Sequence, residues 1–62
     1  MIKFITQIKG NNKVTYNVYY KSGRKRTFAE KDTVPDSVVI FLVNSENSET
    51  RVTATGTVTI FR

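Results

Sequence analysis

The sequence predicts a small single α+β domain of βββαβ order: a three-stranded antiparallel meander, one short helix and a long C-terminal strand. Residues 2–9 and 13–21 alternate apolar and polar side chains with a period of two, which is typical of half-buried strands. Residues 35–44 space their apolar side chains as a helix does. A chain of 62 residues has room for only one domain, which we take to span residues 1–62.

The first two strands are joined by the turn-forming residues Gly10–Asn12. A three-residue loop there pairs Ile8 with Val14 and Phe4 with Val18, so apolar side chains meet across the hairpin. A two-residue loop would place the two apolar sets on opposite faces, and we therefore expect the longer loop. This register directs Ile2, Phe4, Thr6 and Ile8 to the core and Lys3, Ile5, Gln7 and Lys9 outward.

The second turn lies in the stretch "KSGRK" and leads to a third strand at about residues 25–30. A three-residue loop Ser22–Arg24, with Gly23 in a left-handed conformation, pairs Val18 with Phe28. We expect this loop because a shorter one would set Phe28 against a polar face. The outward residues are then Thr15, Asn17, Tyr19 and Lys21 on the second strand and Lys25, Thr27 and Ala29 on the third.

The segment at about 35–44 is predicted to be a helix. Thr33 followed by Asp36 resembles a capping box, and Pro35 suits a first helical turn. Ile40 and Val43 form an apolar back face. The stripe at helical spacing consists of Val34, Val38, Phe41, Leu42 and Ser45. The stretch is also rich in β-branched residues, so a buried strand is the alternative.

The last segment, at about residues 50–62, alternates over its whole length. It fits one long strand with a bend or bulge at Gly56. It also fits a hairpin with a loop at Thr55–Thr57 that pairs Ala54 with Val58. We expect the single strand, because hairpin arms that short gain little.

Charge is unevenly distributed along the chain. Residues 1–28 hold seven basic residues and no acid, whereas the remaining residues hold three basic and five acidic ones, which divides the net charge of +5 into +7 and −2. Such a field attracts polyanions. The longest apolar run, "VVIFLV", is far shorter than the ~20 residues of a membrane helix, and the first residues are not typical of a signal peptide. We therefore expect a soluble cytoplasmic protein that makes no membrane contact.

Residue types exclude most site chemistry. The chain has no cysteine and no histidine, so disulfides, thiol chemistry and histidine acid–base catalysis are ruled out. Its five acidic residues are scattered, which argues against a metal site. No base is placed to activate a serine or threonine. We expect a binding protein rather than an enzyme, with no cofactor, no metal and no small-molecule substrate.

The leading hypothesis is nucleic-acid binding by a basic sheet face and the turn at 21–26. The predicted registers set Lys21 opposite Lys25 and Lys9 opposite Lys13, and such like-charge pairs destabilise a sheet unless an anion binds them. Basic side chains neutralise phosphates, and a tyrosine stacks on bases. The predicted contact residues are Lys3, Tyr19, Lys21, Arg24, Lys25 and Arg26. DNA and RNA fit these residues equally.

The alternative hypothesis is a protein-interaction module, such as a homodimer, an inhibitor or an assembly factor. The C-terminal segment is uncharged from Val52 to Phe61 and, at a sheet edge, would offer unpaired backbone groups for strand addition. The back face of the helix would add a second surface. The predicted interface residues are Ile40, Val43, Val58, Ile60 and Phe61. If this strand instead pairs within the sheet, Phe61 packs on a neighbour.

Overall fold

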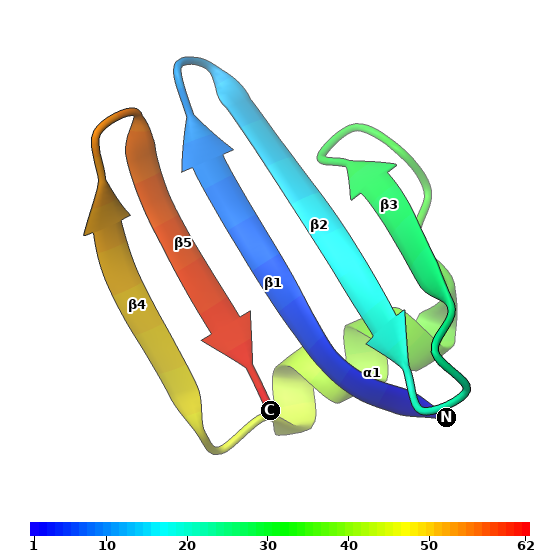
Figure 1. Cartoon of the computed structure of the whole chain (residues 1–62). Coiled ribbons are helices and arrows are strands. Elements are labelled where there is room, and N and C mark those ends of the chain that lie inside the picture. The colour runs from blue at the N-terminus through cyan, green and yellow to red at the C-terminus, as the bar shows by residue number, and fades with distance from the viewer.

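The chain folds into one five-stranded antiparallel sheet with a single helix across one of its faces (Figure 1). The computed structural model describes residues 1–62 without a gap. The strands are β1 (Ile2–Gly10), β2 (Lys13–Tyr20), β3 (Lys25–Ala29), β4 (Ser48–Thr53) and β5 (Gly56–Phe61). Their order in the sheet is β3-β2-β1-β5-β4, and α1 (Asp36–Asn44) connects β3 to β4. The predicted α+β class is confirmed, although the C-terminal segment forms two strands instead of one.

The core lies between α1 and the sheet face that α1 crosses. Its centre consists of four buried apolar side chains, namely Ile5, Val18, Phe28 and Val38. Partly buried side chains surround them: Ile2, Tyr16, Tyr20, Val34, Phe41, Leu42 and Phe61. We call this side of the sheet the helix face. The other side, which we call the open face, is covered by no element of the chain (Figure 1).

The helix presents the predicted apolar stripe to the core. Val38 is fully buried, and Phe41 and Leu42 pack against the core from the same side. Ile40 and Val43 point away from it and are exposed, as expected for a back face. At nine residues, α1 is too short to span a membrane.

The predicted capping box at the helix start does not form. Pro35 occupies the N-cap position in an extended conformation, and no side chain caps the helix. Its carbonyl oxygen accepts the Val38 N–H at 3.0 Å. A capping box would need Thr33 at the N-cap, two residues earlier. The proline fixes its own φ at −60° and disfavours helical geometry in the preceding Val34, so the helix does not begin earlier.

The β1–β2 hairpin corrects the predicted register. Gly10 pairs with Lys13, so the loop contains only Asn11 and Asn12, and Asn12 adopts a left-handed φ of 60°. Asparagine tolerates this conformation, which makes the two-residue turn possible. The predicted three-residue loop is therefore wrong, and the faces of β1 are reversed because the side-chain period is two. Ile5 is buried opposite Val18 on the helix face.

A bulge near the start of β1 restores the predicted direction of the first side chain of the strand, Ile2. Phe4 pairs with Tyr19 and Ile2 pairs with Tyr20, so one extra residue is inserted between them. Such an insertion shifts the alternation of side chains by one. Ile2 therefore packs on the core as predicted, whereas Phe4, predicted to be inward, lies on the open face.

The β2–β3 turn lies one residue earlier than predicted. The Tyr20 N–H donates to the Arg24 carbonyl oxygen at 2.9 Å, which closes a loop at Lys21–Gly23 instead of Ser22–Arg24. Gly23 has the expected left-handed conformation, with φ at 92°. The loop keeps the predicted length of three residues, and the predicted outward faces of β2 and β3 are therefore correct.

The C-terminal segment forms a hairpin, and the preferred single strand is wrong. Thr53 pairs with Gly56, so the loop consists of Ala54 and Thr55 and not of the alternative Thr55–Thr57. β5 lies between β1 and β4. Folding back lets the second arm pair on both sides, and this central position supplies the stability that short arms lack in isolation.

Candidate functional site

A half-buried aromatic pair lies on the open face at the end of the sheet near the β2–β3 turn. Phe4 of β1 and Tyr19 of β2 are cross-strand neighbours whose rings stack, with centroids 4.5 Å apart and planes 20° apart. Lys25 of β3 pairs with Tyr19 from the other side, and its Nζ lies 5.6 Å from the centre of the tyrosine ring. Both side chains are half-buried, and no helix or strand covers them. We call Phe4, Tyr19 and Lys25 the aromatic platform.

Polar residues form the next row of the open face. Asn17 lies between Thr6 and Thr27 on neighbouring strands. The Thr27 hydroxyl donates to Asn17 Oδ1 at 2.9 Å, and Asn17 is 8% exposed. A nearly buried polar side chain needs a hydrogen-bond partner, and Thr27 supplies one to Asn17. The bond also links β2 to β3 beside the platform.

A basic hollow adjoins the platform at the β2–β3 turn. It has a volume of about 500 Å³ and is lined by Tyr20, Ser22, Arg24, Lys25 and Arg26. Both ion pairs of the structure involve Glu49, with Arg51 at 3.3 Å and Arg62 at 3.6 Å. The three cations of the hollow are therefore unneutralised by the chain itself, and Lys25 belongs to the hollow and to the platform.

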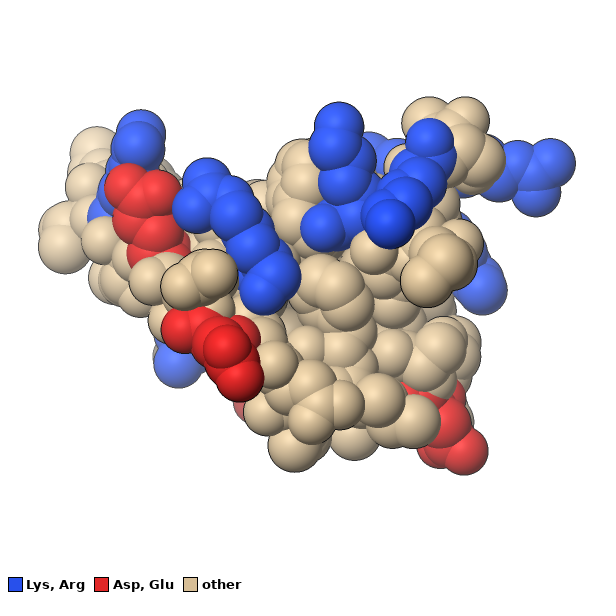
Figure 2. Space-filling view, turned by 90° about the horizontal axis from the view of Figure 1, so that it is seen from below, with Lys and Arg blue, Asp and Glu red and all other residues tan.

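Over the whole molecule, basic side chains gather toward the open face, and most acidic side chains lie away from it (Figure 2). Figure 2 views the domain from the end of the sheet with the open face upward, and Lys and Arg side chains gather along that upper side. Acidic side chains lie at the left and at the lower right of this view. An anion that approaches the open face from this end therefore meets mostly positive charge.

The structure brings together most of the predicted contact residues. Arg24, Lys25 and Arg26 line the hollow, and Tyr19 belongs to the platform. Arg26 is on the helix face, where its guanidinium lies 5.0 Å from the centre of the Phe28 ring.

Lys21 and Lys3 are exposed beside this cluster. The Lys21 N–H donates to the Met1 carbonyl oxygen at 2.9 Å, which joins the turn to the start of the chain. Lys3 lies within the β1 bulge and is not the cross-strand neighbour of Tyr19, although the predicted pairing of Phe4 with Val18 would have placed it there. Phe4 takes that place.

Phe4 is the site residue that the sequence reasoning missed. A three-residue β1–β2 loop predicts Phe4 in the core, whereas the two-residue loop of the structure places it on the open face. The signal that could have found it is the pair Asn11–Asn12, which can form a two-residue turn by itself.

The predicted like-charge pairs do not form. Lys9 faces Val14 and Thr57, and Lys13 faces Gly10. Lys25 faces Tyr19 because the second turn lies one residue earlier than predicted. Repulsion between opposed lysines is therefore no argument for an anionic partner, and the case for one depends on the platform and the hollow.

The residues of the predicted protein interface are dispersed. Val58 and Ile60 lie on the open face of β5, paired on both sides, and Phe61 packs against the core. The C-terminal strand is thus internal, and the position expected for it at the edge of the sheet belongs to β4. Ile40 and Val43 are 58% and 77% exposed on the outer side of α1.

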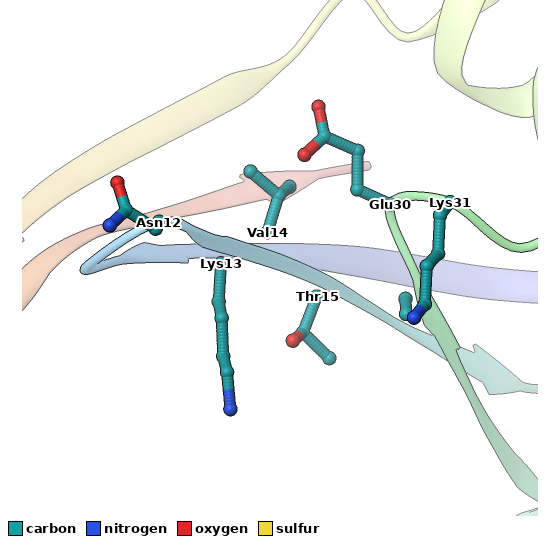
Figure 3. A pocket seen from close by; sticks show the side chains of 7 residues that line it. Asn12, Lys13, Val14, Thr15, Glu30 and Lys31 are labelled. Atoms are coloured by element: carbon teal, nitrogen blue, oxygen red, sulfur yellow. The ribbon is translucent and has the colours of Figure 1, made fainter.

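A second hollow lies where β2 extends beyond β3. It has a volume of about 620 Å³ and is lined by Asn12, Lys13, Val14, Thr15, Ala29, Glu30 and Lys31. Figure 3 shows that Val14 and Glu30 point to one side of β2, whereas Lys13 and Thr15 point to the other. Because these side chains diverge, the hollow offers no convergent set of polar groups that could hold a ligand.

Comparison of the chain with protein-family models, with curated proteins and with solved structures found no significant match in any of the three. The functional argument therefore starts from the residues and their geometry.

Proposed function

We propose that this domain binds single-stranded nucleic acid on its open face, with a base on the aromatic platform and neighbouring phosphates at the basic hollow. One observation carries the proposal: the stacked, half-buried Phe4–Tyr19 pair lies on a sheet face that no element covers, and Lys25 connects it to a hollow lined by three cations that have no acidic partner. Sheet faces that display aromatic rings beside basic side chains are a common way to bind single strands, because bases stack on the rings.

The platform favours a single strand over a duplex. A base in a duplex is stacked on both sides and hides its faces, whereas a splayed base can lie on Phe4 or Tyr19. Every base has such a face, so the platform tolerates many sequences. DNA and RNA share this chemistry and are distinguished by the binding measurement itself.

The basic hollow supplies the electrostatic part of binding. Arg24 offers a planar guanidinium group that can bind a phosphate with two hydrogen bonds, and Lys25 adds a point charge next to the tyrosine ring. Arg26 adds positive charge to the hollow from the helix-face side. Lys3 and Lys21 extend the positive surface beside them. Phosphates held here keep the strand in position over the platform.

Fluorescence anisotropy with labelled single-stranded DNA and RNA of mixed sequence tests the proposal. Replacing Tyr19 or Phe4 with leucine keeps apolar volume but removes the stacking ring, and we expect each change to weaken binding by about 1–3 kcal/mol. Ile8→Ala is the control on the same face at the far end of β1, where the side chain is 41% exposed. It should leave the affinity within about twofold of the wild type.

A second arm of the experiment tests the phosphate contacts. Lys25→Gln should weaken binding and reduce the salt dependence of the affinity by about 0.7 in log–log slope, as expected for one lost contact to a single strand. Lys9→Gln removes the same charge from the helix face at the other end of the sheet and should have little effect. No binding to either strand at low salt, or equal binding by the leucine variants and the wild type, would contradict the proposal.

A further inference from the structure

The two edges of the sheet differ in how well they are protected. At the β3 edge, the Ala29 N–H donates to Asp32 Oδ2 at 2.9 Å, and the Ala29 carbonyl oxygen accepts the Asp32 N–H at 3.0 Å. These bonds occupy the backbone groups of Ala29, which a further strand would need at that end of the edge. Lys25 and Arg26 on the same strand add like charges that repel a second copy. The β3 edge is thus protected by occupied backbone groups at one end and by like charges at the other.

The β4 edge has no such protection. All six residues of Ser48–Thr53 are exposed, and β4 pairs only with β5. Its ladder runs without a bulge, and the strand contains neither proline nor lysine. Bulges, proline and lysine are among the devices that keep an edge strand from pairing, and without them β4 presents a row of open hydrogen-bonding groups; its two charges, on Glu49 and Arg51, are of opposite sign.

The direction of those groups follows from one hydrogen bond. The Arg62 N–H donates to the Asn47 carbonyl oxygen at 3.0 Å, so the backbone of Asn47 faces β5. Backbone direction alternates along a strand, and the groups of Glu49, Arg51 and Thr53 therefore also face β5. Those of Ser48, Thr50 and Val52 face outward, where no other strand lies.

We infer that two copies of this chain associate through β4, with their edge strands antiparallel and Thr50 opposite Thr50 of the second copy. In this register Ser48 faces Val52 of the second copy, so the outward backbone groups of both strands meet and form hydrogen bonds. Glu49 then lies opposite Arg51 of the second copy, on each side of the twofold axis. The edge strand is complementary to itself in both backbone and charge.

Neighbouring registers lose this complementarity. A shift by one residue sets outward groups against inward ones and breaks the ladder. A shift by two residues places Glu49 opposite Glu49 or Arg51 opposite Arg51, and like charges directly opposite each other destabilise a sheet. The charges therefore select one register among those that the backbone permits.

Association of this kind would make one continuous sheet from the two domains. Because the twofold axis runs perpendicular to the sheet, both helices lie on one side and both aromatic platforms on the other. The inference does not depend on nucleic-acid binding, but it would place two such sites on one surface and increase the avidity for a longer strand.

Analytical ultracentrifugation of the wild type and of Thr50→Pro tests the inference. Proline removes an N–H that faces outward, so the bonds between β4 and β5 remain, while the central bonds of the dimer are lost. We expect a wild-type dimer at tens of micromolar and a dissociation constant at least about tenfold higher for the variant. Circular dichroism checks that the variant is folded.

A charge-swap series tests the register with exposed residues only. Glu49→Arg and Arg51→Glu should each weaken the dimer, because each sets like charges opposite one another. The double variant Glu49→Arg/Arg51→Glu should recover wild-type association, and so should a mixture of the two single variants. Hydrogen exchange should show slower exchange at the amides of Ser48, Thr50 and Val52 in the dimer than in the monomer.

Three results would overturn the inference. One is a wild-type protein that stays monomeric at tens of micromolar. Another is a dimer that Thr50→Pro and the charge swaps leave unchanged. The third is a dimer that Val43→Lys dissociates, since Val43 is exposed on the outer side of α1 and its loss would place the contact on the helix.

Discussion

Gly56→Ala is expected to destabilise the domain by at least about 3 kcal/mol, which is a large part of the stability expected for a chain of this size. A Cβ at Gly56 would overlap the Lys9 carbonyl oxygen and lie 2.8 Å from the Lys9 carbonyl carbon. These are backbone atoms of the neighbouring strand and cannot turn aside as a side chain does. Gly56 also has a backbone φ of 156°, which residues with a side chain rarely adopt.

The expected damage extends beyond one contact. Gly56 begins β5 directly after the turn, and β5 joins β4 to the rest of the sheet through β1. Moving the backbone of β5 away from Lys9 would weaken the ladder at Lys9–Thr57 and the pair Thr53–Gly56 together. The glycine is therefore required by the close approach of two strands.

Gly10→Ala is the matched control for this prediction. A Cβ at Gly10 would meet the Thr55 carbonyl oxygen at 3.6 Å, an ordinary van der Waals distance. We expect a change within about 0.5 kcal/mol, because alanine also reduces the freedom of the unfolded chain. Urea unfolding followed by circular dichroism measures both variants. Equal stability of the two would show that β1 and β5 are not this close.

The second large effect is expected for Ile5→Ala, at about 2–5 kcal/mol. Ile5 has no exposed surface and lies on the central strand between Val18 of β2 and Phe61 of β5. Only four apolar side chains form the centre of the core. Shortening one of them leaves a cavity, and a core this small has few neighbouring side chains that could move in to fill it.

Ile40→Ala supplies the control with the same change of side chain. Ile40 is 58% exposed on α1, so little apolar burial is lost, and alanine favours the helix. We expect a change of less than about 1 kcal/mol in the urea unfolding free energy. A loss for Ile5→Ala as small as that for Ile40→Ala would mean that Ile5 points outward, as the three-residue β1–β2 loop predicts.

The hairpin turns show what a sequence pattern can and cannot decide. In β1, apolar residues occupy both alternating sets, with Phe4 and Ile8 on one side and Ile5 on the other. The pattern therefore fits two registers that differ by one residue, and the conformation of Asn12 selects between them. Both arms of the second hairpin alternate more clearly, and its faces were predicted correctly despite a turn that was one residue off.

The candidate site inherits these ambiguities. Tyr19 and Lys25 could be placed on the outer face from sequence, because the β2–β3 loop length was correct. Phe4 could not, since its position depends on the two-residue β1–β2 turn, and the bulge beyond Phe4 returns only Ile2 to the core. The bulge inserts one residue and so turns the Ile2 side chain toward the core. Nothing in the local composition indicates that a bulge forms there.

The sequence by itself determined the α+β class, the strand and helix segments up to residue 44, the apolar stripe of α1 and the basic character of the first half of the chain. These features depend on local periodicity and composition. Tertiary structure decided the C-terminal hairpin, the internal position of β5, the stacking of Phe4 on Tyr19 and the exposed edge of β4. Each of these depends on which distant strand lies alongside, and side-chain alternation is the same for a central strand as for an edge strand.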